Sequence, residues 1–171
     1  MGAGLKQTIA AGLRFLLLAL AVLPVGGYSV ESGQPAADFV LKSTTGPNLR
    51  LSEYRGRVVV VGFWASWCGD CRAQMRELET LRSELEGSEL ELLAVSVDSE
   101  NYQARDAAES LKLGFPVLHD AGGQVSELYE VDRMPYLVML DRDGVVRADF
   151  SGFRRGDEDE YREQVQNLLD E

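Results

Sequence analysis

The stretch from Val58 to Glu86 constrains the fold of this chain more than any other part of its sequence. It begins with an almost unbroken run of apolar and β-branched residues, from Val58 to Trp64. Such a run is typical of a parallel strand covered on both faces, because a strand with one solvated face would alternate apolar and polar residues. From Cys71 onward, apolar residues recur every three or four positions, at Met75, Leu78, Leu81 and Leu85. This spacing predicts an amphipathic helix directly after the strand.

The two cysteines of the chain, Cys68 and Cys71, lie at the junction of this strand and helix. Residues three apart in a first helical turn share one face, with Cα atoms roughly 5 to 6 Å apart, which suits a disulfide. The helix dipole and the unpaired N–H groups at this end favour the thiolate form. Because the thiolate is the attacking species in disulfide exchange, we expect Cys68 to be the nucleophile. Cys71, one turn inside and more shielded, would then resolve the mixed disulfide.

A structural disulfide and half of a zinc site are the simpler interpretations of this pair. A structural bridge across so short a loop would restrain little of the unfolded chain. A zinc site needs further ligands, and the chain has no other cysteine and only one histidine. A redox role is therefore favoured.

The segment around the two cysteines resembles a known family. The segment FWASWCGDC, from Phe63 to Cys71, is followed by a helix and much later by Met134-Pro135 in front of an apolar strand. This pattern resembles the membrane-anchored or periplasmic thiol-disulfide oxidoreductases of the TlpA/ResA type, from about Glu31 to the C-terminus. The resemblance implies an α/β thioredoxin fold with an N-terminal β-hairpin extension and a central α-β insertion. We expect neither a cofactor nor a metal ion at the site.

The remaining elements follow from periodicity and turn residues. We expect strands at 38–41, 48–51, 90–97 and 115–118, a helical turn at 52–56, helices at 101–113 and up to Tyr129, a hairpin of strands 136–140 and 145–150, and a last helix from Asp157. The strand at 90–97 should lie parallel to the first strand. Asp98-Ser99-Glu100 should cap the helix at 101–113, and Gly114 should close it.

Met134-Pro135 is the second expected part of the site. A proline is tolerated at the first residue of a strand, so the dipeptide could simply mark a strand start. The resemblance implies more: Pro135 is cis, packs over the two sulfurs and leaves the Met134 backbone free to pair with an extended substrate segment. Met134 would give this groove a pliable apolar lip.

Several positions depart from the family pattern. Asp70 stands between the cysteines where these proteins often have proline. We hypothesise that its carboxylate opposes formation of the Cys68 thiolate, favours the disulfide and makes the protein a reductant. Trp67, next to Cys68, should shield the site and contact partners.

No carboxylate is evident as a proton shuttle to Cys71. Gly62 takes the place of the buried acid of thioredoxin, Gln74 stands where some relatives have Glu, and Arg76 replaces a helix-kinking proline. We therefore expect water or Asp70 to move the proton.

The N-terminus has the pattern of a secretory signal. Lys6 and Arg14 precede a short apolar run, Phe15 to Leu23, and small residues follow up to Gly27. The run is shorter than the about 20 apolar residues of a spanning helix, which favours cleavage, although an uncleaved signal anchor stays open. The expected organisation is a signal peptide or anchor at 1–27, a connector at 28–36 and a thioredoxin-like domain at 37–171.

This organisation places the domain in the periplasm or elsewhere outside the cytoplasm, free or anchored in the inner membrane. There, a vicinal cysteine pair suits exchange with other exported thiols. The resemblance suggests partners such as apocytochrome c or other exported proteins with oxidised cysteine pairs, and a membrane electron donor. The net charge of −11 disfavours nucleic-acid binding.

Three alternatives remain. A copper-handling assembly factor of similar fold would use Cys68, Cys71 and His119 as ligands, although such proteins usually space the cysteines one residue wider. A thiol peroxidase would need a hydroxyl residue and an upstream proline where this chain has Ala65 and Val61. An interaction module with an incidental disulfide is the third.

Overall fold

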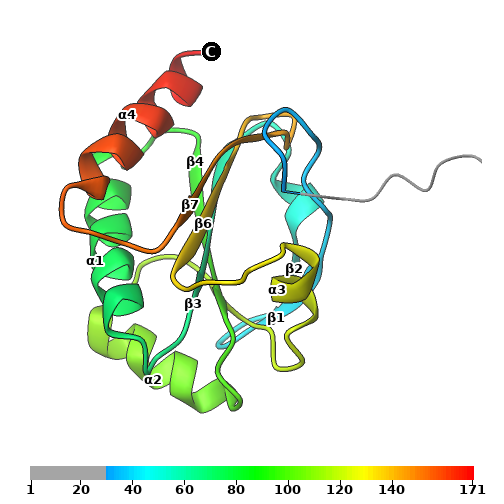
Figure 1. Cartoon of the computed structure of the whole chain (residues 1–171), viewed down its shortest axis with the longest axis vertical. Coiled ribbons are helices and arrows are strands. Elements are labelled where there is room, and N and C mark those ends of the chain that lie inside the picture. The colour runs from blue at the N-terminus through cyan, green and yellow to red at the C-terminus, as the bar shows by residue number, and fades with distance from the viewer. Residues whose placement is uncertain (1–29) are drawn as a thin grey trace, which may run out of the picture.

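A seven-stranded mixed sheet with helices on both faces forms the described part of the chain, residues 30–171, in this computed structural model (Figure 1). The elements are β1 (Val40–Ser43), β2 (Asn48–Arg50), the 3₁₀ helix η1 (Leu51–Tyr54), β3 (Val58–Trp64), α1 (Gly69–Glu84), β4 (Leu90–Ser96), α2 (Asn101–Leu111), β5 (Val117–His119), α3 (Gln124–Leu128), β6 (Tyr136–Leu140), β7 (Val146–Ser151) and α4 (Asp157–Asp170). The strand order is β2-β1-β5-β4-β3-β6-β7. The predicted signal peptide or anchor at residues 1–27 lies outside the described residues.

The centre of the sheet confirms the predicted strand-helix-strand unit. β3 and β4 are parallel and in register from Val58 opposite Leu90 to Trp64 opposite Ser96, with α1 connecting them. β5 lies parallel to β4 on one side, and β6 lies antiparallel to β3 on the other. The hairpin of β1 and β2 joins the sheet through β5, so the predicted N-terminal extension pairs with the predicted α2-β5 insertion.

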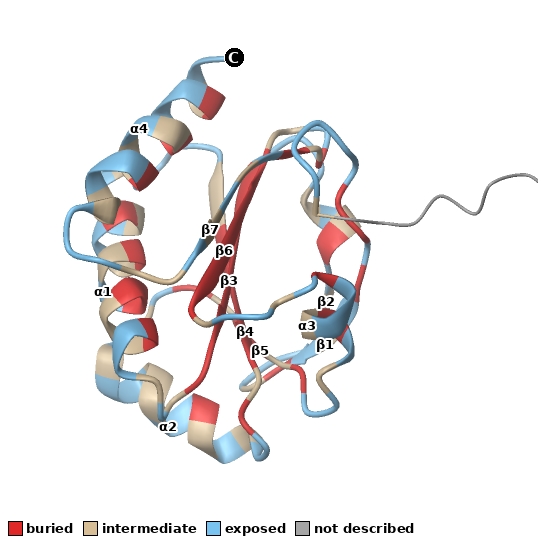
Figure 2. Cartoon of the chain, in the orientation of Figure 1, coloured by how far each residue is buried: buried red, intermediate tan, exposed pale blue. Residues whose placement is uncertain are grey.

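β3 is buried on both faces along its whole length (Figure 2). Val58, Val60 and Trp64 belong to the core cluster beneath α1, α2 and α4, whereas Val59, Val61 and Phe63 belong to the cluster on the opposite face, with η1 and α3. This two-sided burial explains why the run does not alternate with polar residues. Among residues 30–171 there is no helix with the length and apolar character needed to cross a bilayer.

The N-terminal strand starts later than predicted, at Val40 and not at Asp38. The Asp38 carboxylate is engaged across the hairpin, because it accepts hydrogen bonds from the N–H and hydroxyl of Ser52 and from the Arg50 guanidinium. The helical turn begins at Leu51, one residue before the predicted start, because the fully buried Leu51 side chain packs into the core. The local sequence pattern does not predict these contacts, because they depend on residues distant in the chain.

The predicted caps of α2 are wrong in part. Glu100 is the N-cap, and its side chain forms a capping box with Gln103. Asp98 is turned inward and is not a cap, as described below. At the other end the helix stops at Leu111 and is closed by Lys112 in the left-handed conformation, with φ of 57°, and not by Gly114 as predicted.

The last helix starts at Asp157, as predicted, and packs beside α1. Tyr161, Val165 and Leu168 are buried, and four acidic residues occupy its first turn, where the helix dipole favours negative charge. At its other end the Arg142 guanidinium donates to the carbonyls of Leu168 and Leu169. These bonds satisfy two carbonyls that have no partner within the helix.

Candidate active site

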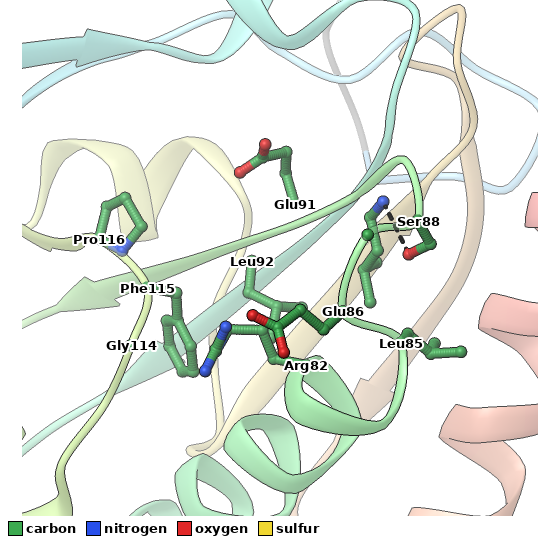
Figure 3. A pocket seen from close by; sticks show the side chains of 11 residues that line it. Arg82, Leu85, Glu86, Ser88, Glu91, Leu92, Gly114, Phe115 and Pro116 are labelled. Atoms are coloured by element: carbon green, nitrogen blue, oxygen red, sulfur yellow. Dashed lines mark hydrogen bonds between the residues drawn. The ribbon is translucent and has the colours of Figure 1, made fainter.

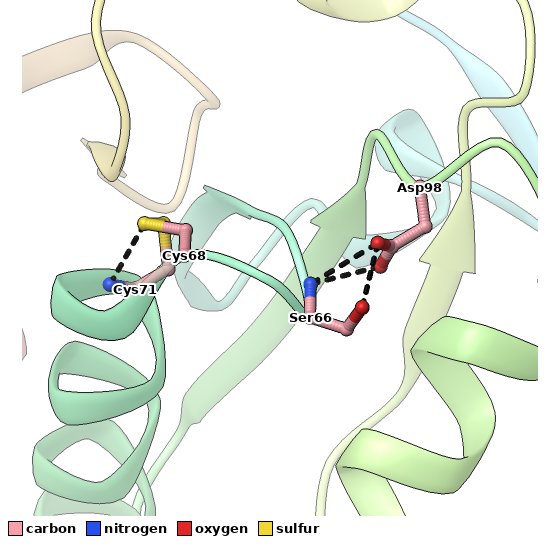
Figure 4. The surroundings of a disulfide bond; sticks show 4 residues. All are labelled: Ser66, Cys68, Cys71 and Asp98. Carbon is pink, nitrogen blue, oxygen red and sulfur yellow. Dashed lines mark hydrogen bonds between the residues drawn. A yellow bond between two sulfur atoms is a disulfide. The ribbon is translucent and has the colours of Figure 1, made fainter.

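Cys68 and Cys71 form a disulfide at the N-terminus of α1 (Figure 4). Their Cα atoms are 5.2 Å apart, within the range expected from the spacing. Cys68 is the N-cap of α1, and its sulfur accepts a hydrogen bond of 3.1 Å from the Cys71 N–H. A sulfur at this position gains from the helix dipole and from unpaired N–H groups, which favours its thiolate in the reduced protein.

The two sulfurs differ in access. Cys71 is fully buried, whereas Cys68 is half-buried between the exposed residues Trp67 and Gly69. An approaching disulfide therefore meets Cys68 first, as the assignment of nucleophile and resolving cysteine requires. Trp67 is 70% exposed and supplies a large apolar surface beside the reactive sulfur. Asp70, also exposed, lies in the first turn between the cysteines.

The Met134-Pro135 segment lies on the same side of the sheet as the pair, since Met134, Cys68 and Cys71 belong to one core cluster. The peptide bond between them is cis, Pro135 is buried, and the partly buried Met134 packs against the core cluster that contains Cys71. The carbonyl of Pro135 accepts a hydrogen bond from the Gly152 N–H. Within residues 30–171, the N–H and C=O of Met134 have no hydrogen-bond partner in the backbone. They are available to an external strand.

The space beneath the cysteines is filled by neutral side chains. A Cβ atom on Gly62 would lie 3.0 Å from the Met75 methyl carbon and 3.4 Å from a methyl carbon of Leu78, so α1 occupies the space where thioredoxin holds an acid. Gln74 is fully buried, and its amide nitrogen donates to the Tyr161 hydroxyl at 3.0 Å. Burial raises the pKa of Tyr161 to about 12, although the bond from Gln74 acts in the opposite direction. Neither group carries charge near neutral pH.

Asp98 lies next to the site, although our interpretation of the sequence pattern does not predict it there. It follows β4, is 1% exposed, and hydrogen bonds to Ser66 in the loop before Cys68 (Figure 4). The sequence does contain a signal for this position, because Asp98 directly follows an apolar strand that is parallel to β3. The carboxyl ends of parallel neighbouring strands lie at the same edge of the sheet, which brings Asp98 near the loop after β3. We interpreted that acid as a helix cap because Ser99 and Glu100 follow it.

A hollow of about 360 Å³ opens next to the site, between the first turns of α1 and the start of α4. Asp70, Arg76 and Glu77 contribute from α1, and Phe153, Arg155 and Glu158 from the other side. A second hollow, of about 210 Å³, lies at the opposite end of α1, around Arg82, Glu86 and Phe115 (Figure 3). It is remote from the cysteines and has no part in their chemistry.

His119 is the third ligand that the copper hypothesis would require. His119 lies on β5, and its Nε2 donates to the main-chain carbonyl of Asp98 at 2.9 Å. The part of the chain that the structure describes contains no group of three or more His, Cys, Asp or Glu side chains arranged to hold a metal ion.

Comparison with known proteins gives the same enzyme class. The model of the AhpC/TSA family matches residues 32–149. Thiol-disulfide oxidoreductase ResA of Geobacillus kaustophilus is 34% identical over 72% of this chain and 71% of its own length. ResA of Geobacillus thermodenitrificans is 33% identical over 86% and 89%. The crystal structure of a candidate thiol:disulfide interchange protein DsbE from Chlorobium tepidum superimposes with a TM-score of 0.78 and 32% identity, covering 81% of this chain and 98% of that one. The chain belongs to the AhpC/TSA family and is a thiol-disulfide oxidoreductase of the ResA/DsbE type.

Proposed function

We propose that this member of the AhpC/TSA family is an exported reductant, which reduces disulfides in other exported proteins, with apocytochrome c as one such substrate. The observation that carries the proposal is the disulfide between Cys68, half-buried at the N-cap of α1, and the fully buried Cys71. This arrangement supports exchange at one sulfur and ring closure by the other.

The reaction starts from the reduced protein. The Cys68 thiolate attacks one sulfur of a substrate disulfide, and the other substrate sulfur leaves with the electron pair and takes up a proton. Cys71 then loses its proton, attacks the Cys68 sulfur and releases the second substrate thiol. Two electrons have passed to the substrate, the two substrate thiols take up their protons from solvent, to which the Cys71 proton is released, and the product is the Cys68–Cys71 disulfide. Since the side chains beneath Cys71 are neutral, water or Asp70 would accept its proton.

Docking would use the edge at Met134-Pro135. The unpartnered N–H and C=O of Met134 could each bond to an extended substrate segment, which would extend the sheet locally. The exposed Trp67 lies beside Cys68 and would cover the other side of the substrate chain. The two contacts would hold the scissile disulfide over the Cys68 sulfur.

Export is supported by the signal pattern of residues 1–27 and by the vicinal cysteine pair, which suits an oxidising compartment. The names of the ResA and DsbE relatives agree with a role in disulfide exchange. A membrane electron donor would return the protein to the dithiol state after each cycle.

The reduction potential of the pair tests the direction of electron flow. We expect a value closer to the about −270 mV of thioredoxin than to the about −120 mV of strongly oxidising periplasmic dithiol proteins. The reduced protein should also cleave an insulin-type disulfide, and Cys68→Ser should abolish this activity while Cys71→Ser accumulates the mixed disulfide. A potential near −120 mV would make the protein an oxidant and would contradict the proposal.

A further inference from the structure

We infer that Asp98 and Ser66 position Cys68: the buried Asp98 carboxylate anchors the loop before α1 and keeps Cys68 at the helix N-cap when the disulfide is open. The inference rests on the exchange chemistry of the cysteine pair and is independent of export and of the direction of electron flow.

The anchor consists of three donor groups on one carboxylate. The Ser66 N–H lies 3.2 and 3.0 Å from the two Asp98 oxygens, and the Ser66 hydroxyl donates to one of them at 2.8 Å. From the other side, the buried Ser96 hydroxyl donates to the second oxygen at 2.8 Å. Burying a carboxylate is costly unless it is hydrogen bonded, so this network holds Ser66 firmly.

The Asp98 backbone is itself fixed. Its N–H donates to the Ser96 hydroxyl, and its carbonyl accepts from His119 on β5. The neighbouring Val97 N–H donates to the Trp64 carbonyl at the end of β3. The anchor therefore connects the loop to the rigid centre of the sheet and not to another loop.

Only one residue separates Ser66 from Cys68. The Cys68 N–H donates to the Ala65 carbonyl, so the anchored turn also fixes the backbone from which the Cys68 side chain projects. At the N-cap, Cys68 has φ of −88° and ψ of 115°, and in this conformation its sulfur receives the Cys71 N–H. Figure 4 shows the disulfide and the Ser66–Asp98 contact on the two sides of this short loop.

The anchor matters most in the reduced protein. In the oxidised protein the covalent bond to Cys71 restrains Cys68. Reduction removes this bond, and the loop must then hold the thiolate against the N–H groups of α1. If the loop moves away, the thiolate loses that stabilisation, and the Cys68 pKa rises.

The test is the pH dependence of Cys68 alkylation by iodoacetamide in the reduced full chain, which reports Cys68 because Cys71 is buried. Removing a hydrogen bond of ordinary strength from the loop should lower the rate at pH values below the Cys68 pKa by about three- to ten-fold in Ser66→Ala. Asp98→Asn should act in the same direction. The limiting rate at high pH should not change, and Ser66→Thr, which keeps the hydroxyl, should restore the wild-type profile.

Asp120→Asn is the matched control. Asp120 is a buried aspartate that accepts main-chain N–H groups from Val125 and Ser126 at the start of α3, on the opposite face of the sheet. Its replacement should lower the melting temperature without moving the alkylation profile.

Two outcomes would overturn the inference. If Ser66→Ala and Asp98→Asn lower the melting temperature but leave the alkylation profile unchanged, the anchor is structural only. If Asp98→Asn instead lowers the Cys68 pKa while Ser66→Ala does not change it, Asp98 acts by its charge and not by position. Failure of the wild-type protein to exchange disulfides would count against the enzyme class and not specifically against this anchor.

Discussion

Asp70 is the residue to which our hypothesis assigns an electrostatic effect on the reactive sulfur. It is exposed in the first turn of α1, between the two cysteines. The positive end of the helix dipole stabilises a carboxylate at this position, but the carboxylate disfavours a second negative charge on Cys68. The helix dipole stabilises the Asp70 carboxylate in both redox states, whereas the repulsion from Asp70 acts only when Cys68 is a thiolate.

We predict that Asp70→Asn lowers the pKa of Cys68 by about half a unit to one unit and makes the reduction potential less negative. The potential should be measured against glutathione, and the pKa by thiolate absorbance. Glu77→Gln, two turns further along α1, is the control and should change neither. Added salt should reduce the difference between Asp70→Asn and wild type, because the interaction crosses solvent. An unchanged potential would show that Asp70 has no part in the reducing character.

At the same scale, the sequence predicted the residues that act through local spacing. Cys68 and Cys71 were assigned from their place in one turn of one helix, and the structure has them bonded there. Asp98 could not be assigned in this way, since its role depends on Ser66, 32 residues earlier in the chain. The neutral pair of Gln74 and Tyr161 joins two helices 87 residues apart and is equally invisible to a local pattern.

Among the elements, β3 and α1 match their predictions because their signals are long and periodic. The short strand β6 also matches, at Tyr136–Leu140, whereas β1 and α2 differ from their predictions at the ends. β1 starts late because Asp38 bonds across the hairpin, and α2 ends early because Lys112 adopts the left-handed conformation. In each case a contact or a backbone conformation decided between residues that local propensity rates similarly.

Glu79 connects α1 to the inserted unit. Its carboxylate bonds to Arg82 on the same helix and accepts the Gly114 N–H at 2.7 Å, between α2 and β5. Burial alone would raise the pKa of Glu79, but the bonds to Arg82 and Gly114 outweigh it and hold the pKa below its ordinary value. A carboxyl group whose pKa falls on folding stabilises the protein above its unfolded pKa, and this stabilisation is lost as the pH falls through the folded value.

We therefore predict that Glu79→Gln lowers the free energy of unfolding by about 1 kcal/mol at pH 7. The difference from wild type should shrink as the pH falls below about 4.5, because the wild-type carboxyl then becomes protonated and is neutral like the Gln side chain. Urea unfolding at a series of pH values measures both quantities. Glu109→Gln on α2 is the control, since Glu109 is exposed and makes no side-chain hydrogen bond within residues 30–171. A difference that persisted unchanged at acidic pH would show that charge on Glu79 is not involved.

For the whole molecule, the redox state and the stability of the fold are linked. A folded dithiol that reduces more strongly than the same pair in an unfolded chain must, by a thermodynamic cycle, belong to a fold that is more stable when oxidised. About 30 mV of potential corresponds to about 1.4 kcal/mol of unfolding free energy.

We predict that the oxidised protein is more stable than the reduced protein by roughly 1 to 3 kcal/mol. Urea unfolding with and without a thiol reductant measures the difference, and the Cys68→Ser/Cys71→Ser double variant, which should not respond to the reductant, is the control. A reduced protein more stable than the oxidised one would indicate an oxidant.

The described chain enters the fold far from its cysteines. Gly33, Gln34 and Ala36 bond to the turn after β6, at Gly144 and Val146. β6 runs from Tyr136, opposite Phe63, to Leu140, opposite Val59, so this turn lies at the start of β3, whereas Cys68 follows its end. Seven residues of strand separate the two poles by roughly 20 Å. A tether at residue 30 would therefore place the disulfide at the end of the domain that faces away from the attachment point. The electron donor and the substrate would then both have to reach the disulfide at that end.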